Sequence, residues 1–419
     1  MDHDAVLSAK VLLFHAGRLD LAQRVRAYRT LLEVNPAAYG PKLARALVST
    51  TYDAALRELP EARLALTEEA LAAILGLSEA DQLRDHLLPD VLGAHQRELC
   101  AAGRRPEALA VRARLLAMGR GAARAHGGPP AGLDGWADGL AEERRHREAA
   151  QAYAEIVRAD REAGRSGDPV TVIALAAQLE AAGRPEAAID AIADLVRRQR
   201  AGAGEESGPM SCLLYTLLHF ARLLDTHGRT GRATTARAEA LALLTGLSGR
   251  KGHPWGYHQA DYWAALLALS GRPDEHPAPG EPVPPYGRPL HAWSPDVRTR
   301  YRADRAALAA EVDTLLPLAE ADPDTHLAAL VTRQRRLVVR AGVEAGDRLG
   351  RMLEELLPLF DRGVALARRL DGLGHPEGPA ALSRALTDRA TMFVAVGQYG
   401  YALADFEQSL PAGARPAAG

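Results

Sequence analysis

The residues best suited to chemistry gather in one stretch of this chain, between positions 253 and 301. Aromatic residues and histidines are enriched there: Trp255, Tyr257, Tyr262, Trp263, Tyr286, Trp293 and Tyr301, with His253, His258, His276 and His291. Aromatic side chains give a large contact area at a small entropic cost, and imidazoles titrate near neutrality. The cluster therefore suits ligand recognition or acid–base chemistry, and it also suits plain packing of an irregular segment against helices.

One predicted helix within this stretch groups three polar side chains. His258, Asp261 and Tyr262 are spaced i, i+3 and i+4, so a helix places them on a common face. An aspartate beside a histidine can hold one tautomer of the imidazole for catalysis or for metal binding. The sequence offers neither a third ligand nor a nucleophile beside the pair, so we expect no metal site and no catalytic site here.

The common enzyme signatures are missing from the rest of the chain. It contains no GxxxxGK[ST] phosphate loop, no GxGxxG after a strand, and no HExxH, CxxC, GxSxG or EF-hand pattern. We therefore expect no cofactor, and the sequence favours a stand-alone binding module over an enzyme.

Composition excludes several other classes of protein. The 419 residues include 51 basic and 53 acidic side chains, a formal net charge of -2, so we predict no nucleic-acid partner. No apolar run approaches the ~18 residues of a membrane span, and the first residues do not read as a secretory signal. With only Cys100 and Cys212, a disulfide scaffold is excluded. We expect a cytoplasmic protein that does not associate with membranes.

A turn followed by alanine recurs along the chain. The turn positions, each at the end of an apolar helical stretch, are Gly17, Gly103, Arg144, Gly183, Gly228, Gly271 and Gly397. Alanine stands five residues after six of the seven, leucine or phenylalanine stands four residues before all seven, and alanine stands seven residues before five. From Gly103 to Gly271 the spacings are 41, 39, 45 and 43 residues. Each unit reads as a helical hairpin, and because one hairpin cannot bury its apolar face alone, the units must stack.

These features resemble tetratricopeptide repeats. Four segments carry the resemblance: GRRPEALAV at 103–111, LDGWADGLAEERRHREAAQAYAEIV at 133–157, GRPEAAIDAI at 183–192 and GQYGYALADFEQSL at 397–410. The period near 42 exceeds the 34 of the standard repeat and is similar to the long-helix variety frequent in actinobacterial and kinesin-light-chain-like proteins. The resemblance implies an all-α fold, an α-solenoid of stacked antiparallel helix hairpins in a right-handed superhelix. We expect such an array not to close on itself.

The resemblance also implies which residues face the concave groove of the array. In such repeats the residues ten and thirteen positions before the turn point into the groove, which for Gly271 are Asp261 and His258. The same rule applied at the turns of Gly228 and Gly397 extends the set along two further helices. We therefore predict a mixed polar and aromatic ligand site made of His258, Asp261, Tyr262, Tyr215, Arg222, Asp225, Trp293, Arg384, Thr387 and Thr391.

Proline divides the chain into parts. Eight prolines fall within the 24 residues from 272 to 295 and forbid a helix there. We expect a repeat array over 1–272, a Pro-rich insertion or lid over 273–295 that brings Trp293 over the groove, C-terminal helical repeats over 296–410 and a disordered tail over 411–419.

Two functions remain open at this point. The first is a cytoplasmic tetratricopeptide-repeat protein that recognises a protein or peptide partner in its concave groove and acts as a scaffold or regulatory adaptor. The alternative is a repeat-derived enzyme or small-molecule receptor, of the kind found in specialised metabolism, with a pocket near the Trp/His-rich segment 253–301. A deep pocket beneath 273–295 would favour the alternative, and an open groove would favour the first.

Overall fold

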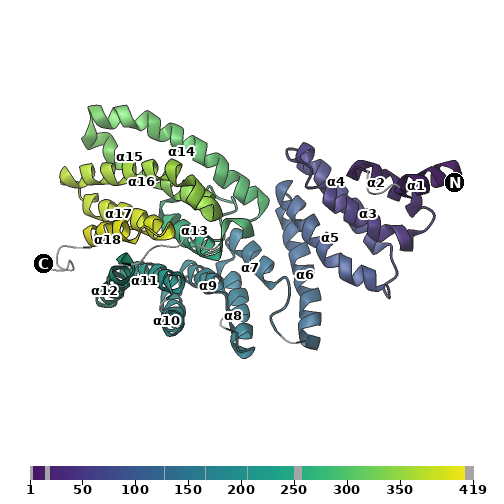
Figure 1. The fold of residues 1–419 in the computed structure, drawn as a ribbon, viewed down its shortest axis with the longest axis horizontal. Helices are drawn as coiled ribbons and strands as arrows, with labels where there is room; N and C mark the ends of the chain where they lie inside the picture. The colour runs from purple at the N-terminus through teal and green to yellow at the C-terminus, as the bar shows by residue number, and fades with distance from the viewer. Residues whose placement is uncertain are drawn as a thin grey trace. The chain divides into compact units, whose positions relative to one another are not determined.

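The fold is helical throughout the part of the chain that the computed structural model describes, residues 3–14, 19–126, 128–165, 167–204, 206–249 and 257–410. These residues form α-helices joined by short turns, a few 3-10 turns and one longer non-helical segment at 275–289, with no strand among them (Figure 1). Most consecutive helices pack against each other. The predicted all-α class is therefore confirmed. The predicted tail at 411–419 lies outside the described residues.

The chain divides into two compact units, each with its own interior. Unit 1 comprises Met1–Gly139 with Ser294–Asp296, and unit 2 comprises Leu140–Trp293 with Val297–Gly419. The boundary falls inside helix α7 (Leu133–Glu142), where the repeat pattern gave no reason to expect one.

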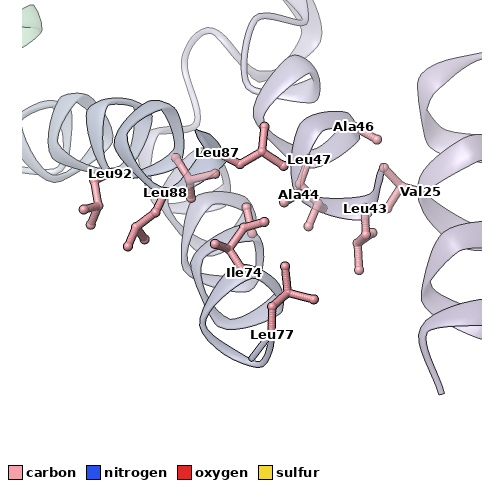
Figure 2. Packing of buried hydrophobic residues seen from close by; sticks show 12 residues of the cluster. Val25, Leu43, Ala44, Ala46, Leu47, Ile74, Leu77, Leu87, Leu88 and Leu92 are labelled. Atoms are coloured by element: carbon pink, nitrogen blue, oxygen red, sulfur yellow. The ribbon is translucent and has the colours of Figure 1, made fainter. Parts of the chain in front are cut away.

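Unit 1 is a run of helical hairpins whose apolar faces interlock. Its helices before α7 are α1 (His3–Phe14), α2 (Leu21–Leu32), α3 (Pro36–Thr50), α4 (Pro60–Leu75), α5 (Gln82–Ala101) and α6 (Arg105–His126). Leu43 and Leu47 from α3 meet Ile74 from α4 in a core where all three side chains are fully buried (Figure 2). Burying a leucine or isoleucine contributes about 1.5–3 kcal/mol, so this seam accounts for much of the cohesion between the hairpins.

Unit 2 holds the remaining helices. They are α8 (His146–Glu162), α9 (Pro169–Ala181), α10 (Pro185–Gly202), α11 (Ser207–Thr226), α12 (Thr230–Ser248), α13 (Tyr257–Gly271), most of α14 (Pro295–Ala321), α15 (Pro323–Ala345), α16 (Leu349–Gly372), α17 (Gly378–Ala395) and α18 (Tyr399–Ser409). The last helices do not extend the stack away from the first. Helix α18 packs against α12, and α13 packs against both α15 and α17 (Figure 1). The expectation that the array never closes on itself is therefore wrong for this unit.

The recurring turn has one hydrogen-bond geometry. At four described turns a glycine adopts a left-handed φ between 70° and 74°, and at the fifth Arg144 does so with a φ of 57°. In each of the five, the amide after the turn residue donates to the carbonyl five residues earlier, as Arg184 N does to Leu179 O at 2.9 Å and Arg229 N to Leu224 O at 2.7 Å. This is the Schellman motif, which needs a left-handed residue just past the helix end. The glycine column of the sequence follows from that requirement.

Gly271 is the exception among the described turns. Its φ is -83°, and the chain continues into a 3-10 turn, η3 (Arg272–Asp274), rather than into the second helix of a hairpin. Without the left-handed residue the chain does not reverse, so it enters the proline-rich segment instead.

The alanine columns lie where paired helices touch. Ala149, Ala188 and Ala233, each five residues after a turn, are fully buried, and so is Ala137, seven residues before one. A larger side chain at these positions would push the helices apart, which explains why the sequence repeats alanine there. Ala22 departs from the pattern because its side chain is exposed.

Candidate functional site

A cleft of about 580 Å³ opens in unit 2, with α11, α13 and α17 around it. Shorter contributions come from α12, η3, α15 and α18. Six of the ten residues predicted to bind ligand line this cleft: Tyr215, Arg222, Asp225, Arg384, Thr387 and Thr391. They come from two helices, α11 and α17, that lie far apart in the sequence.

One wall of the cleft is formed by side chains that hydrogen-bond one another across α11, α13 and α17. The Tyr215 hydroxyl donates to the Thr391 carbonyl at 2.9 Å, and the Trp263 indole N–H donates to Thr391 Oγ1 at 3.2 Å. Thr391 in turn donates its hydroxyl to the Asp388 carbonyl at 2.8 Å. Burial raises the pKa of Tyr215 well above its ordinary value, so the phenol stays neutral. These groups hold α11, α13 and α17 together and form a fixed surface.

A buried ion cluster forms the second wall. Arg335 on α15 donates from Nε to Asp388 Oδ2 at 2.9 Å, pairs with Asp274 in η3, and donates from Nη2 to the carbonyl and the hydroxyl of Ser270. Burial raises the pKa of Asp388, although the charge of Arg335 opposes the shift. Burial lowers the pKa of Arg335, but its two carboxylates outweigh burial and the net shift is upward. The cluster ties four elements together, and nothing in the spacing of Arg335 marks it in the sequence.

Arg222 is the cationic group of the cleft that stands out. Its Nε and Nη2 atoms are buried and have no hydrogen-bond partner within the described ranges of the chain. Burial lowers the pKa of Arg222; Glu180 opposes this shift, and the like charges of Arg272 and Arg335 add to it. Glu180 itself is held by His227 at 3.2 Å, with Arg272 at 3.9 Å. The guanidinium of Arg222 is thus desolvated without compensation from a bonded carboxylate.

The other titratable groups of the cleft are paired, neutral or exposed. Arg237 on α12 forms an ion pair with Asp225. His219, buried one turn before Arg222, has a pKa well below its ordinary value because burial and the charge of Arg222 both disfavour the imidazolium. Arg384 is exposed on α17. Four arginines and three aspartates therefore line the cleft, which leaves one positive charge in excess.

Helix α13 presents a different face to the cleft from the one predicted. Trp263, Leu266, Leu267 and Ser270 line it, at i, i+3, i+4 and i+7. The side chain of Tyr262 is 3% exposed and hydrogen-bonds Thr216 and Gln199 instead. The sequence predicts that Tyr262 lines the site because it shares a helix face with His258 and Asp261, but the helix is turned so that its neighbour Trp263 lines the cleft.

Asp261 also falls outside the cleft lining. Asp261 Oδ2 lies 3.7 Å from Nδ1 of His291, in the segment that follows η3. The side chain of His258 lies outside the described residues, so the predicted His–Asp pair stays a prediction.

Trp293 packs in the interior of unit 2 and not over the cleft. Its side chain is 2% exposed, its indole N–H donates to the Arg288 carbonyl at 3.0 Å, and its ring meets Tyr301 edge-on with centroids 4.9 Å apart. The amide of Val283 donates to the Glu142 carbonyl at 3.0 Å. Of the segment 273–295, only Pro273 and Asp274 reach the cleft. The prediction that Trp293 covers the groove is corrected, because its aromatic ring anchors the segment.

A metal-binding cluster and a membrane-spanning helix are two features that the described part of the chain does not contain. In the described part of the chain, no three His, Cys, Asp or Glu side chains come together in a way that could hold a metal ion. None of the helices described has both the length and the apolar character that crossing a bilayer demands.

Comparison with known proteins identifies no family. No family model matches the chain, and no curated protein matches its sequence. Among solved structures, the chain is similar to one chain of "Structure of Naa15/Naa10 bound to HypK-THB", at 13% sequence identity and a TM-score of 0.35. The similarity covers 94% of this chain and 56% of that chain, so this chain spans little more than half of that one. At this level of similarity neither a detailed fold nor a partner carries over.

Proposed function

We propose that this chain is a cytoplasmic tetratricopeptide-like binding protein, of the long-period type, whose unit 2 cleft holds part of a protein or peptide partner. It acts as a scaffold or regulatory adaptor. The observation that carries the proposal is the cleft itself, which is lined both by apolar side chains such as Leu218, Leu266 and Phe406 and by Arg222, whose Nε and Nη2 have no partner among the described residues. An apolar wall with a few fixed polar groups is the usual composition of a recognition site.

The state of the hydroxyl groups in the cleft favours binding over catalysis. Ser270, Ser383, Thr387 and Thr391 each donate to a backbone carbonyl. A hydroxyl nucleophile needs a base in hydrogen-bond contact, and these protons are already committed elsewhere. Such hydroxyls stabilise the helices that shape the cleft.

A small-molecule receptor is the second candidate, because of the way unit 2 folds back. With α17 and α18 packed on α13 and α12, the cleft has walls on more than one side, unlike the open groove of a simple stack. Its volume of about 580 Å³ falls in the range of about 300–1,000 Å³ that is usual for small-molecule sites.

Selection from a displayed library of random short peptides tests the first candidate. Ala380 lines the cleft from an exposed position of α17, so Ala380→Trp fills the cleft without disturbing a core. Ala404, exposed on α18 and not among the lining residues, gives the matched control Ala404→Trp. Enriched peptides should bind the wild type and Ala404→Trp but not Ala380→Trp. Equal binding to all three proteins, or no enrichment, contradicts peptide recognition in this cleft.

A further inference from the structure

Arg222 presents one particular edge of its guanidinium without a partner. The atoms Nε and Nη2 lie side by side along that edge, and their two N–H bonds point in nearly the same direction. This is the edge that binds the two oxygens of a carboxylate in a bidentate manner. Both atoms are buried, and neither is hydrogen-bonded to any described residue. A buried donor pair with this geometry is costly to the free protein, which calls for an explanation.

The other charges of the cleft show how much negative charge the site can accept. Arg335 is matched by Asp274 and Asp388, and Arg237 is matched by Asp225. With exposed Arg384 in addition, the excess is a single positive charge. His219 adds none, because it is neutral near pH 7. A monoanion balances this excess, whereas a phosphate dianion or an acidic peptide would bring further negative charge close to three aspartates.

The apolar residues that line the cleft indicate the chemistry of the rest of the ligand. Leu218 stands one turn before Arg222 on α11, and Leu266, Pro273 and Phe406 complete the apolar surface. A ligand that fits has one carboxylate and a compact apolar remainder that fits within about 580 Å³.

We infer that the unit 2 cleft binds a small apolar monocarboxylic acid whose carboxylate pairs with the guanidinium of Arg222. Because Nε and Nη2 are covered in the structure, the bidentate contact through that edge requires the Arg222 side chain to turn toward the cleft. This inference rests on the second candidate of the proposed function, a small-molecule receptor whose site is the unit 2 cleft, and it names the ligand class as a small organic acid. Arg222 is the anchoring group. The donors of Tyr215 and Trp263 are already hydrogen-bonded to Thr391, so this wall does not compete with Arg222 for the carboxylate.

Binding of matched acids and amides to the full chain tests the inference. The probes are octanoate and 4-phenylbutyrate, each paired with its primary amide, together with phenyl phosphate and N-acetylated short peptides with a free or amidated C-terminus. Calorimetric titration should show that each acid binds roughly tenfold or more tightly than its amide, because a charge-assisted bidentate contact is lost. Acids and amides that bind alike, or phenyl phosphate that binds more tightly than the acids, overturn the inference. Peptides that require a free carboxylate while the small acids fail also overturn it.

Two variants of Arg222 separate a binding role from a structural one. Arg222→Lys keeps the charge but loses the planar fork, so acid binding should weaken roughly tenfold or more while amide binding stays the same. Arg222→Met removes the donors entirely and should abolish the preference for acids. Because no bonded partner is lost, the melting temperature of Arg222→Met should be unchanged or higher. A large drop in melting temperature, or a preference for acids that survives in both variants, contradicts the role of Arg222.

The cleft-filling variant distinguishes failure of this inference from failure of the proposed function. If ligands of any kind are blocked by Ala380→Trp but show no preference for acids, the cleft is a ligand site and only the carboxylate assignment is wrong. If the acids bind equally well to Ala380→Trp and Ala404→Trp, they bind elsewhere and the cleft itself is not the site.

Discussion

The ion cluster around Arg335 gives the sharpest test of how unit 2 is held together. In the variant Arg335→Met, an unbranched apolar side chain replaces the aliphatic stem of the arginine, and Asp274 and Asp388 lose their counter-charge. Asp388 is 10% exposed at its side chain and Asp274 is 23% exposed, so neither carboxylate is fully hydrated. Removing one partner of a buried ion pair typically costs about 3–5 kcal/mol, and we expect a loss of that size in the free energy of unfolding.

The pH dependence of this loss identifies its cause. Burial already raises the pKa of Asp388 in the presence of Arg335, and without Arg335 the pKa must rise further. When the pKa of a carboxyl group is higher in the folded state than in the unfolded state, the folded state binds more protons. The free energy of unfolding therefore rises as the pH falls. The deficit of Arg335→Met relative to the wild type should therefore be largest near neutrality and shrink as the pH falls toward the ordinary carboxylate value of 3.8.

Urea denaturation followed by tryptophan fluorescence measures this loss, since Trp263 and Trp293 lie in unit 2. The matched control is Arg333→Met on the same helix. Arg333 pairs with Glu311 at 2.7 Å, but the two side chains are 41% and 50% exposed, so its loss should cost less than about 1 kcal/mol. Equal losses for the two variants, or a deficit for Arg335→Met that does not change with pH, would refute the assignment of Arg335 as a buried structural charge.

Three further predictions follow from packing and burial. A Cβ added at Gly342 would lie 2.5 Å from a methyl of Leu267 and 3.1 Å from a ring atom of Trp263, so Gly342→Ala should lower the free energy of unfolding in urea by about 1–3 kcal/mol. The control is Gly350→Ala, which should not destabilise the protein because no atom lies within 4 Å of the added Cβ. The pKa of His219 is depressed in the folded state, so the free energy of unfolding should be constant above the ordinary histidine pKa of 6.5 and fall as the pH drops below it. The variant His219→Leu should flatten this dependence on pH, and the same change at exposed His276 should leave the dependence intact. Burial raises the pKa of the Cys212 thiol to about 11, so iodoacetamide should alkylate it much more slowly than a free cysteine near pH 8, and rapid labelling of the folded protein would show the thiol to be accessible.

The repeat could be predicted from the sequence because its requirements are local. A Schellman turn needs a residue that tolerates positive φ, so glycine recurs where each first helix ends, and the single substitution at Arg144 keeps the same backbone conformation. Close helix pairs need small side chains, so alanine recurs at fixed distances from the turn. Because these rules act within one hairpin, a single sequence displays them without any knowledge of the rest of the fold.

Part of the cleft could be predicted for the same reason. Tyr215 and Arg222 on α11 and Thr387 on α17 line it because their helices keep the regular register of the repeat. On α13 the register differs: Asp261, which the groove rule selected, and Tyr262 on the same face do not line the cleft, whereas Trp263 does. This helix ends at Gly271 without a Schellman turn, so its orientation depends on packing against α15 and α17 and not on a hairpin partner.

The rest of the cleft depends on contacts that no periodicity encodes. Arg335 meets Asp388 across 53 residues of sequence and Asp274 across 61. Neither separation is a multiple of the repeat, because α15 to α18 return onto the earlier helices of the unit. The same return brings α18 against α12. Only the three-dimensional fold places these charges together, and only there does it become visible that Nε and Nη2 of Arg222 have no hydrogen-bond partner among the described residues.

The arginine side-chain N–H signals of the nitrogen-15-labelled full chain test the central claim most directly. In the absence of ligand, the Nε–H signal of Arg222, assigned by its loss in Arg222→Lys, should report a buried donor without an acceptor. Addition of 4-phenylbutyrate should move this signal strongly. The Nε–H signal of Arg335, which is already bonded to Asp388, should stay nearly unchanged, and 4-phenylbutyramide should move neither signal. A shift confined to exposed arginines, or an Arg222 signal that responds equally to the acid and to the amide, would contradict a carboxylate site in the cleft.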